Sequence, residues 1–235
     1  METWLAFLFR KLRVRDKVSR RHFNWKKVLV DIDESARGGY PSFWSTRDYA
    51  ELAGGLADSK VHVQSHPGVL VFVVEHPVFA EPFHFQALFQ EKWEGPRSLH
   101  LRYIELGPGS QGSAIGTRLF AVHAYAAARL GFRTIYADAL SSRVVPPRNT
   151  KSFNGAYTLA RWGFDAELPV EQSNLVPGAF RHCCWISELM ETNGGREYWR
   201  HFGTSVLSAF DLSTGSDSWK TLESYLNERA IRILQ

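Results

Sequence analysis

Alternating and continuous runs of apolar residues predict a β-sheet in the first half of the chain. Residues 60–65 alternate, residues 69–74 form a continuous β-branched run, and a His-Pro-Gly turn separates them. This pattern predicts a hairpin whose second strand is buried on both faces. Residues 27–32 and 98–106 are further strand candidates, and a capping pattern that begins at Ser45 predicts a short helix to about Leu56.

Three other segments have different patterns. Residues 3–17 place apolar residues at helical spacing between basic ones, which predicts a basic amphipathic helix. Such a helix could lie on an anionic membrane or on nucleic acid, or pack its apolar side on the body of the protein. Residues 77–97 hold three prolines, four phenylalanines and Trp93, which predicts an aromatic connection that is partly helical. Residues 218–232 predict a helix in an aromatic C-terminal extension.

Composition and charge narrow the class of protein. The chain has 235 residues, of which 44% are hydrophobic and 22% charged, so disordered, collagenous and coiled-coil classes are excluded. The first thirty residues hold nine Lys/Arg and two acidic residues, a net charge of +7. The remainder has 28 − 9 = 19 basic and 24 − 2 = 22 acidic residues, a net charge of −3. The body of the protein therefore lacks the basic surface of a nucleic-acid-binding domain.

The cysteines and histidines predict neither disulfides nor a metal site. Cys183 and Cys184 are adjacent, and adjacent cysteines rarely form a bridge, which favours a reducing compartment and a cytoplasmic location. The nine histidines lack the spacing of metal-binding motifs. No apolar run approaches the about 20 residues of a membrane span, so neither a transmembrane helix nor a signal peptide is expected.

The most informative segment is a strand, a glycine-rich turn and a helix. Residues 98–106 form the strand, residues 107–116 contain four glycines, and a helical pattern follows to Leu130. Backbone N–H groups at a helix start lack intrahelical partners, so small residues there let a phosphate approach. A Walker loop is absent. The literal Gly-x-Gly-x-x-Gly of residues 107–112 contains Pro108 and lacks the acidic residue that a dinucleotide-binding fold needs.

In this context, Gln111 to Gly116 resembles the acetyl-coenzyme A pyrophosphate loop of the GNAT superfamily of N-acyltransferases. Residues 133–139 resemble the fifth strand of that family, and residues 154–164 resemble its helix that begins with Asn and ends in Gly-Phe. The resemblance spans residues 27–170. It implies an α/β fold with a mixed, mostly antiparallel central sheet flanked by helices.

The resemblance also implies roles for individual residues. Coenzyme contacts fall on Leu106, Gln111, Gly112, Ser113, Ala114, Ile115, Gly116, Thr117 and Asn154. Glu105, at the end of a strand, is the first candidate for the general base, and Asp138 is the second. Tyr157 is the candidate acid for the leaving thiolate. Two positions depart from the family pattern, because Ala114 stands where a glycine is usual and Leu159 stands where the acidic tyrosine is frequent.

Together these features predict three parts: a basic leader at residues 1–26, a GNAT-like core at 27–170 and an aromatic helical extension at 171–235. The implied activity moves an acetyl or short acyl group from acetyl-CoA to an amine on a small molecule or a protein. The alternative is a catalytically inactive GNAT-like binding or scaffold module, whose basic N-terminus docks to nucleic acid or an anionic surface.

Overall fold

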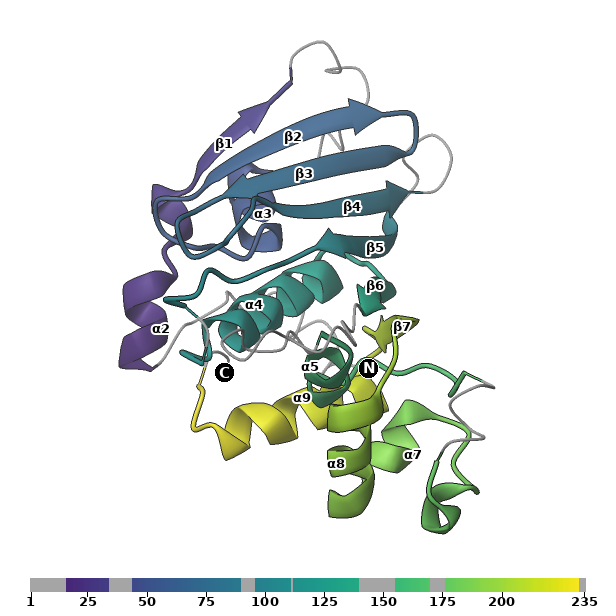
Figure 1. Cartoon of the computed structure of the whole chain (residues 1–235). Helices are drawn as coiled ribbons and strands as arrows, with labels where there is room; N and C mark the ends of the chain where they lie inside the picture. The colour runs from purple at the N-terminus through teal and green to yellow at the C-terminus, as the bar shows by residue number, and fades with distance from the viewer. Residues whose placement is uncertain are drawn as a thin grey trace. The chain divides into compact units, whose positions relative to one another are not determined.

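The computed structural model describes residues 16–33, 44–89, 96–110, 112–139, 155–169 and 176–232 (Figure 1). Packing divides the chain into two units, of which the first comprises residues 1–135 with 226–235 and the second residues 136–225. The predicted helix over residues 3–17 lies outside the described residues except for its last two positions, and the three-part division of the chain remains a prediction.

The first unit contains a mixed, mostly antiparallel sheet, as the sequence predicts. Its strands are β1 (Leu29–Ile32), β2 (Lys60–His66), β3 (Val69–Glu75), β4 (Phe83–Phe89) and β5 (Pro96–Tyr103). Strands β1 and β2 are parallel, and each of the following neighbours, from β2 to β5, pairs antiparallel. The predicted hairpin is therefore confirmed as β2 and β3. The parallel pair needs a crossover connection, which α3 (Thr46–Leu52) provides.

Strand β4 corrects the prediction of a partly helical connection over residues 77–97. Phe83, Phe85, Ala87 and Phe89 are buried and the residues between them are half-buried, which is the period of two of a strand. This alternation is difficult to recognise in the sequence, because a histidine and a glutamine separate the aromatic residues. For residues 27–106 the sequence predicts a strand, a helix, a hairpin and a strand. The first unit consequently has one strand more than predicted.

The sheet is fully covered on only one face. Leu70, Phe72 and Val74 of β3 are buried, while the alternate residues are half-buried, so the prediction of a strand buried on both faces is wrong. Helices α3 and α4 (Ile115–Arg129) lie on the buried face. There the ring of Phe72 stacks on Phe85 at 4.3 Å, and Phe85 meets the imidazole of His123, on α4, edge to face at 5.0 Å. Helix α4 thus packs directly on the aromatic core.

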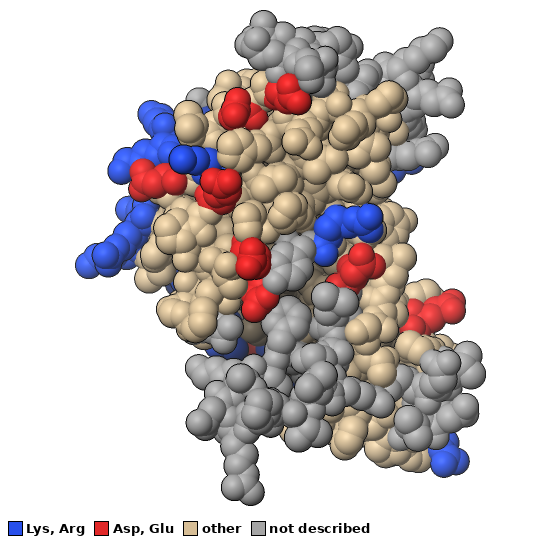
Figure 2. Space-filling model, turned by 45° about the horizontal axis from the view of Figure 1, so that its top comes forward, with Lys and Arg blue, Asp and Glu red and all other residues tan. Residues whose placement is uncertain are grey.

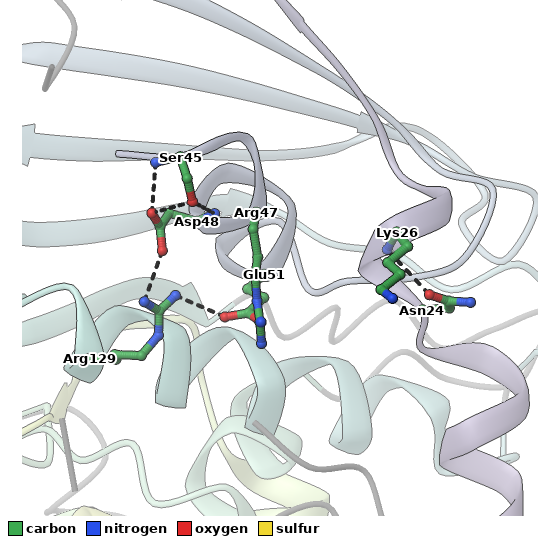
Figure 3. Close-up of polar contacts among 7 residues, drawn as sticks. All are labelled: Asn24, Lys26, Ser45, Arg47, Asp48, Glu51 and Arg129. Carbon is green, nitrogen blue, oxygen red and sulfur yellow. Dashed lines mark hydrogen bonds and ion pairs between the residues drawn. The ribbon is translucent and has the colours of Figure 1, made fainter. Parts of the chain in front are cut away.

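An ion-pair network fixes the C-terminal end of α4 to α3 (Figure 3). The guanidinium of Arg129 lies 2.8 Å from Asp48 and 2.8 Å from Glu51, and Arg47 holds the other carboxylate oxygen of Glu51 at 2.6 Å. Only 1% of the Glu51 side chain is exposed. Ser45 and Asp48 form a capping box that starts α3, as the sequence predicts. A buried carboxylate between two arginines makes this junction specific in geometry.

The described part of the basic N-terminal segment belongs to the first unit. It forms α2 (Lys17–His22) and the short helix η1 (Trp25–Lys27). Between them Phe23 is buried and forms a bridge with Leu56, and the Asn24 N–H donates to the Gly55 carbonyl. Residues 16–27 are therefore packed on the first unit.

The second unit contains helices and short strands. Its elements are α5 (Gly155–Arg161), η4 (Gly178–Phe180), α7 (Ile186–Met190), α8 (Asn193–Phe202) and β7 (Val206–Asp211). Strand β6 (Thr134–Ala139) and helix α9 (Asp217–Glu228) each contain a boundary between the units. Strand β7 is an addition to the helices that the sequence predicts for the C-terminal extension. The Gly-Phe end of α5 has a packing reason, because a Cβ on Gly163 would lie 2.3 Å from the Ser218 carbonyl oxygen.

Candidate functional site

The chain enters α4 through a tight turn that leaves small residues at the helix start. The Ser110 N–H donates to the Gly107 carbonyl, and the Ser113 hydroxyl donates to the Ser110 carbonyl. Gly112 has a φ of 78°, in the left-handed region that glycine adopts at low cost. A Cβ at Gly112 would meet nothing within 4 Å, so the backbone here is open to an approaching group.

The N-cap of α4 is unusual. Ala114 occupies it with a φ of 59°, a left-handed conformation that is costly for a residue with a Cβ. Alanine also offers no side-chain oxygen to the first turn, whereas serine, threonine, aspartate or asparagine is preferred at this position. Strained backbone conformations are concentrated at ligand-binding and active sites. At Ala114 the strain coincides with a poor N-cap residue.

The first turn of α4 leaves backbone donors available. The Ile115 N–H reaches the Ser113 hydroxyl at 3.4 Å, and the Arg118 N–H donates to the Ala114 carbonyl. Among the described residues, no acceptor is found for the N–H groups of Gly112, Ala114 and Gly116. Three donors of this kind, together with the positive end of a helix of fifteen residues, favour a bound anion.

The strand end that precedes the turn is held by residues 78–80. The Ala80 N–H donates to the Glu105 carbonyl and the Gly107 N–H donates to the Val78 carbonyl, so Phe79 and Leu106 face each other as an antiparallel pair. In such a pair the N–H of the middle residue points away from the partner segment. The Gly107 N–H is therefore bonded to the Val78 carbonyl, and the Leu106 N–H points to the opposite edge of the strand.

A buried ion pair lies beside the first turn of α4. Nη1 of Arg118 contacts both carboxylate oxygens of Asp16 at 2.6 Å and also donates to the Ser19 hydroxyl. Burial raises the pKa of Asp16, but hydrogen bonds from Ser19 and Arg118 outweigh it and hold that pKa below its usual value. The Arg118 side chain is only 8% exposed, and its buried Nε has no acceptor among the described residues.

The ion pair was not predictable from the sequence. Asp16 and Arg118 are 102 positions apart, and neither belongs to a recognisable motif. The only indication of a partner in the sequence is the position of Arg118. A charged residue in the first turn of an otherwise apolar helix needs a partner when that helix is buried.

The predicted site residues fall into three groups. The first unit brings together Glu105, Leu106 and the turn from Gly112 to Thr117, with Glu105 half-buried and Gly116 and Thr117 buried. Tyr157, on α5, and Asp138, on β6, belong to the second unit, where Tyr157 is half-buried and Asp138 exposed. Leu159, which replaces the family's tyrosine, is buried. Gln111 and Asn154 lie outside the described residues.

The two cysteines are free and lie in different environments. Cys183 is buried and Cys184 is exposed. Burial, with the Glu188 carboxylate nearby, raises the pKa of the Cys183 thiol, which keeps it protonated. Its sulfur lies 3.7 Å from Nε2 of His182. Within the described ranges no group of three metal-ligating side chains is found, and no helix has the length and apolar character needed to cross a membrane.

A hollow of about 400 Å³ lies on the more open face of the sheet. Its lining includes Val71, Glu81, His84, Phe85, Gln86 and Arg102. None of the predicted site residues lines it. Its mixed lining, with one acidic and one basic side chain, does not select a ligand class.

No protein-family model matches the chain, and no curated protein matches it. The chemistry of the start of α4 is therefore the basis for a functional proposal.

Proposed function

We propose that the start of α4 binds the pyrophosphate of acetyl-CoA and that the protein transfers an acetyl or short acyl group from this coenzyme to an amine. One observation carries the proposal: three backbone N–H groups at the start of a fifteen-residue helix, those of Gly112, Ala114 and Gly116, have no acceptor among the described residues. A pyrophosphate supplies the negative oxygens that such donors bind.

Neighbouring groups support the same ligand. The buried Nε of Arg118, on the first turn, adds a positively charged donor without an acceptor among the described residues. The openness at Gly112 leaves room for a phosphate oxygen near the backbone. Ala114 restricts the approach by one methyl group, but its left-handed conformation is the one that a glycine would adopt there. A GNAT-like fold is part of this proposal, with β4 as an additional strand before β5.

The reaction assigns roles to the predicted residues at the end of β5. A backbone N–H at the end of β5, near Leu106, would donate to the thioester carbonyl oxygen and stabilise the charge that develops on it. The neutral amine nitrogen attacks the carbonyl carbon, a C–N bond forms, and Glu105 accepts the proton that the nitrogen loses. The C–S bond then breaks, and the leaving thiolate takes a proton from solvent. The products are an amide and free coenzyme A.

A second candidate is a module that binds the coenzyme and does not catalyse transfer. Two observations favour it: Leu159, at the position of the family's acidic tyrosine, is a buried apolar residue, and Ala114 stands in the place of a glycine. This candidate shares the anion site with the first and differs only in turnover.

One experiment separates the two candidates. The full chain is incubated with acetyl-CoA and a panel of amines, and the release of the free coenzyme thiol is followed alongside the thermal stability of the protein. At about 100 times its dissociation constant a ligand stabilises the fold by about 2.7 kcal/mol. Stabilisation with amine-dependent thiol release supports transfer, and stabilisation without it supports the binding module. The absence of both would contradict the coenzyme site.

Glu105→Gln provides a control for the mechanism. A general base contributes about 100-fold or more to rate and nothing to pyrophosphate binding, so this variant should lose turnover and keep its thermal shift with acetyl-CoA. Tyr157→Phe tests the residue that the resemblance assigns to the leaving thiolate. Full turnover in both variants would remove both residues from the mechanism.

A further inference from the structure

The N-terminal part of the first unit carries a cationic surface, which we call the α2 surface. It consists of the side chains of Lys17, Arg20, Arg21, Lys26 and Lys27, all of which are exposed. They belong to α2 and η1, within twelve consecutive residues, 16–27, whose single acidic residue is Asp16. In Figure 2, Lys and Arg side chains gather along one edge of the view, with a few acidic side chains beside them.

The charge of the α2 surface is largely uncompensated. The side chains of Lys17, Arg21, Lys26 and Lys27 have no ion pair with any described residue, and Asp16 is already paired with Arg118. The Asp58 N–H donates to the Lys27 carbonyl, and Asp58 is exposed. Arg47 and Arg129, by contrast, are paired with carboxylates of α3. These four cations, those of Lys17, Arg21, Lys26 and Lys27, are therefore available to an external anion.

The α2 surface is also preformed. The Asp16–Arg118 ion pair fixes the first residue of the segment to α4, and the Asp16 N–H donates to the Arg232 carbonyl. Buried Phe23 fixes the link between α2 and η1. A charged surface held in this way presents its cations together, without the entropic cost of ordering a free tail.

Apolar side chains accompany these cations. Val18 of α2 is 48% exposed and Leu29, which follows η1 at the start of β1, is 61% exposed. The sequence that precedes α2 combines Trp4, Leu5, Leu8, Phe9 and Leu12 with four basic residues between positions 10 and 15. The phosphate groups of a lipid or of a nucleic acid attract these cations, but exposed aliphatic side chains such as Val18 and Leu29 favour a bilayer.

We infer that the α2 surface docks the protein onto bilayers that contain anionic phospholipids. Its cations interact with the lipid headgroups, and the exposed apolar side chains enter the interface between headgroups and acyl chains. This inference does not depend on the proposed acyl transfer, since it uses neither Glu105 nor the turn into α4.

The test is co-sedimentation of the full chain with vesicles. Vesicles of phosphatidylcholine with about 30% phosphatidylserine are compared with vesicles of phosphatidylcholine alone, from about 0.05 M to about 0.5 M NaCl. We expect binding only to the vesicles with phosphatidylserine, and loss of binding at high salt. The double variant Lys17→Gln/Arg21→Gln should bind about thirtyfold more weakly, which corresponds to about 1 kcal/mol for each cation near an anionic surface.

The matched control is Arg133→Gln/Arg181→Gln, which removes the same charge from exposed positions outside the α2 surface. It should bind as the unmodified chain does. Equal loss in both double variants, equal binding to the two kinds of vesicle, or no binding to either would overturn the inference. Tighter binding to a short DNA duplex than to vesicles would also overturn it and assign the surface to nucleic acid. The far-UV circular dichroism of each variant verifies that it is folded.

Discussion

Arg118, on the first turn of α4, forms a 2.6 Å contact with Asp16, the N-cap of α2, although the two residues are 102 positions apart in the sequence. At the other end of the same helix, Arg129 is paired with Asp48 and Glu51. Helix α4 is thus held at both ends by ion pairs and along its length by the aromatic core. A helix start held in this way can present its backbone donors in a fixed arrangement, which is what an anion site requires.

The first prediction concerns this ion pair. Asp16→Asn keeps a good N-cap residue on α2 but leaves the charge of Arg118 largely buried without a carboxylate. We expect the free energy of unfolding to fall by about 3 kcal/mol, because breaking a buried pair leaves an uncompensated charge. Urea denaturation measures the change. The exposed pair of Asp217 and Lys220 is the control, where Asp217→Asn should cost less than about 1 kcal/mol. Equal effects at the two sites would show that the buried pair has no special weight.

The second prediction concerns the strained N-cap of α4. Ala114→Gly removes a Cβ from a left-handed conformation, so it should raise the free energy of unfolding by about 1 kcal/mol. Ala126→Gly, in the buried interior of the same helix, should lower it by about 1 kcal/mol or more. Thermal denaturation of both variants tests whether the two substitutions change the stability in opposite directions. Destabilisation by Ala114→Gly would mean that the left-handed N-cap is not strained.

The third prediction concerns the pH dependence of stability. His123 is buried, and burial lowers its pKa to about 4, although a hydrogen bond to the Leu52 carbonyl acts in the opposite direction. This bond makes Nδ1 the donor, so the remaining nitrogen, Nε2, is the one that would bind a proton, and it has no partner among the described residues. Because the folded pKa lies below that of the unfolded chain, the unfolded state binds the proton first as the pH falls. Stability contributed by the neutral ring is lost between about pH 7 and pH 4.

The size of this effect can be measured by comparison with a variant. His123→Phe removes the titrating group and leaves the Leu52 carbonyl without its donor, so it should be less stable at neutral pH. Between about pH 7.5 and pH 5, the unmodified chain should lose about 2 kcal/mol more than this variant does. Parallel urea titrations at the two pH values give the difference. Identical pH dependence in the two proteins would contradict a neutral, buried His123.

Local patterns predicted the elements whose signals are contained within a few residues. The hairpin of β2 and β3, the capping box at Ser45 and the long helix that ends near Leu130 all rest on spacing or on turn chemistry. Strand β4 was missed because Pro77, Pro82 and Pro96 surround it, and its alternation is visible only when His84 and Gln86 are taken as partly exposed residues.

The candidate site could be predicted only in part, for a related reason. The glycine-rich turn identified the backbone donors at the start of α4, since their chemistry is local. The Asp16–Arg118 pair, the commitment of the Gly107 amide to Val78, and the burial of Glu51 between two arginines all depend on contacts between segments distant in the sequence. Such contacts follow from the packing of the sheet and helices and carry no sequence pattern of their own.

The central claim is that the start of α4 binds the pyrophosphate of coenzyme A, and Ser113 allows a direct test. This exposed residue immediately precedes the N-cap. Ser113→Asp places a negative charge beside the backbone donors. This charge interacts favourably with the helix dipole but repels a phosphate. Ser113→Asn has nearly the same shape without the charge. The two variants therefore separate electrostatics from shape, and neither is expected to prevent folding.

Isothermal titration calorimetry of the full chain with coenzyme A is the deciding measurement. The account predicts binding by the unmodified chain, similar affinity in Ser113→Asn, and at least about tenfold weaker affinity in Ser113→Asp, together with unchanged or slightly higher thermal stability of the ligand-free Asp variant. Equal affinity of the Asp and Asn variants, or no binding by the unmodified chain, would contradict a pyrophosphate site at the start of α4.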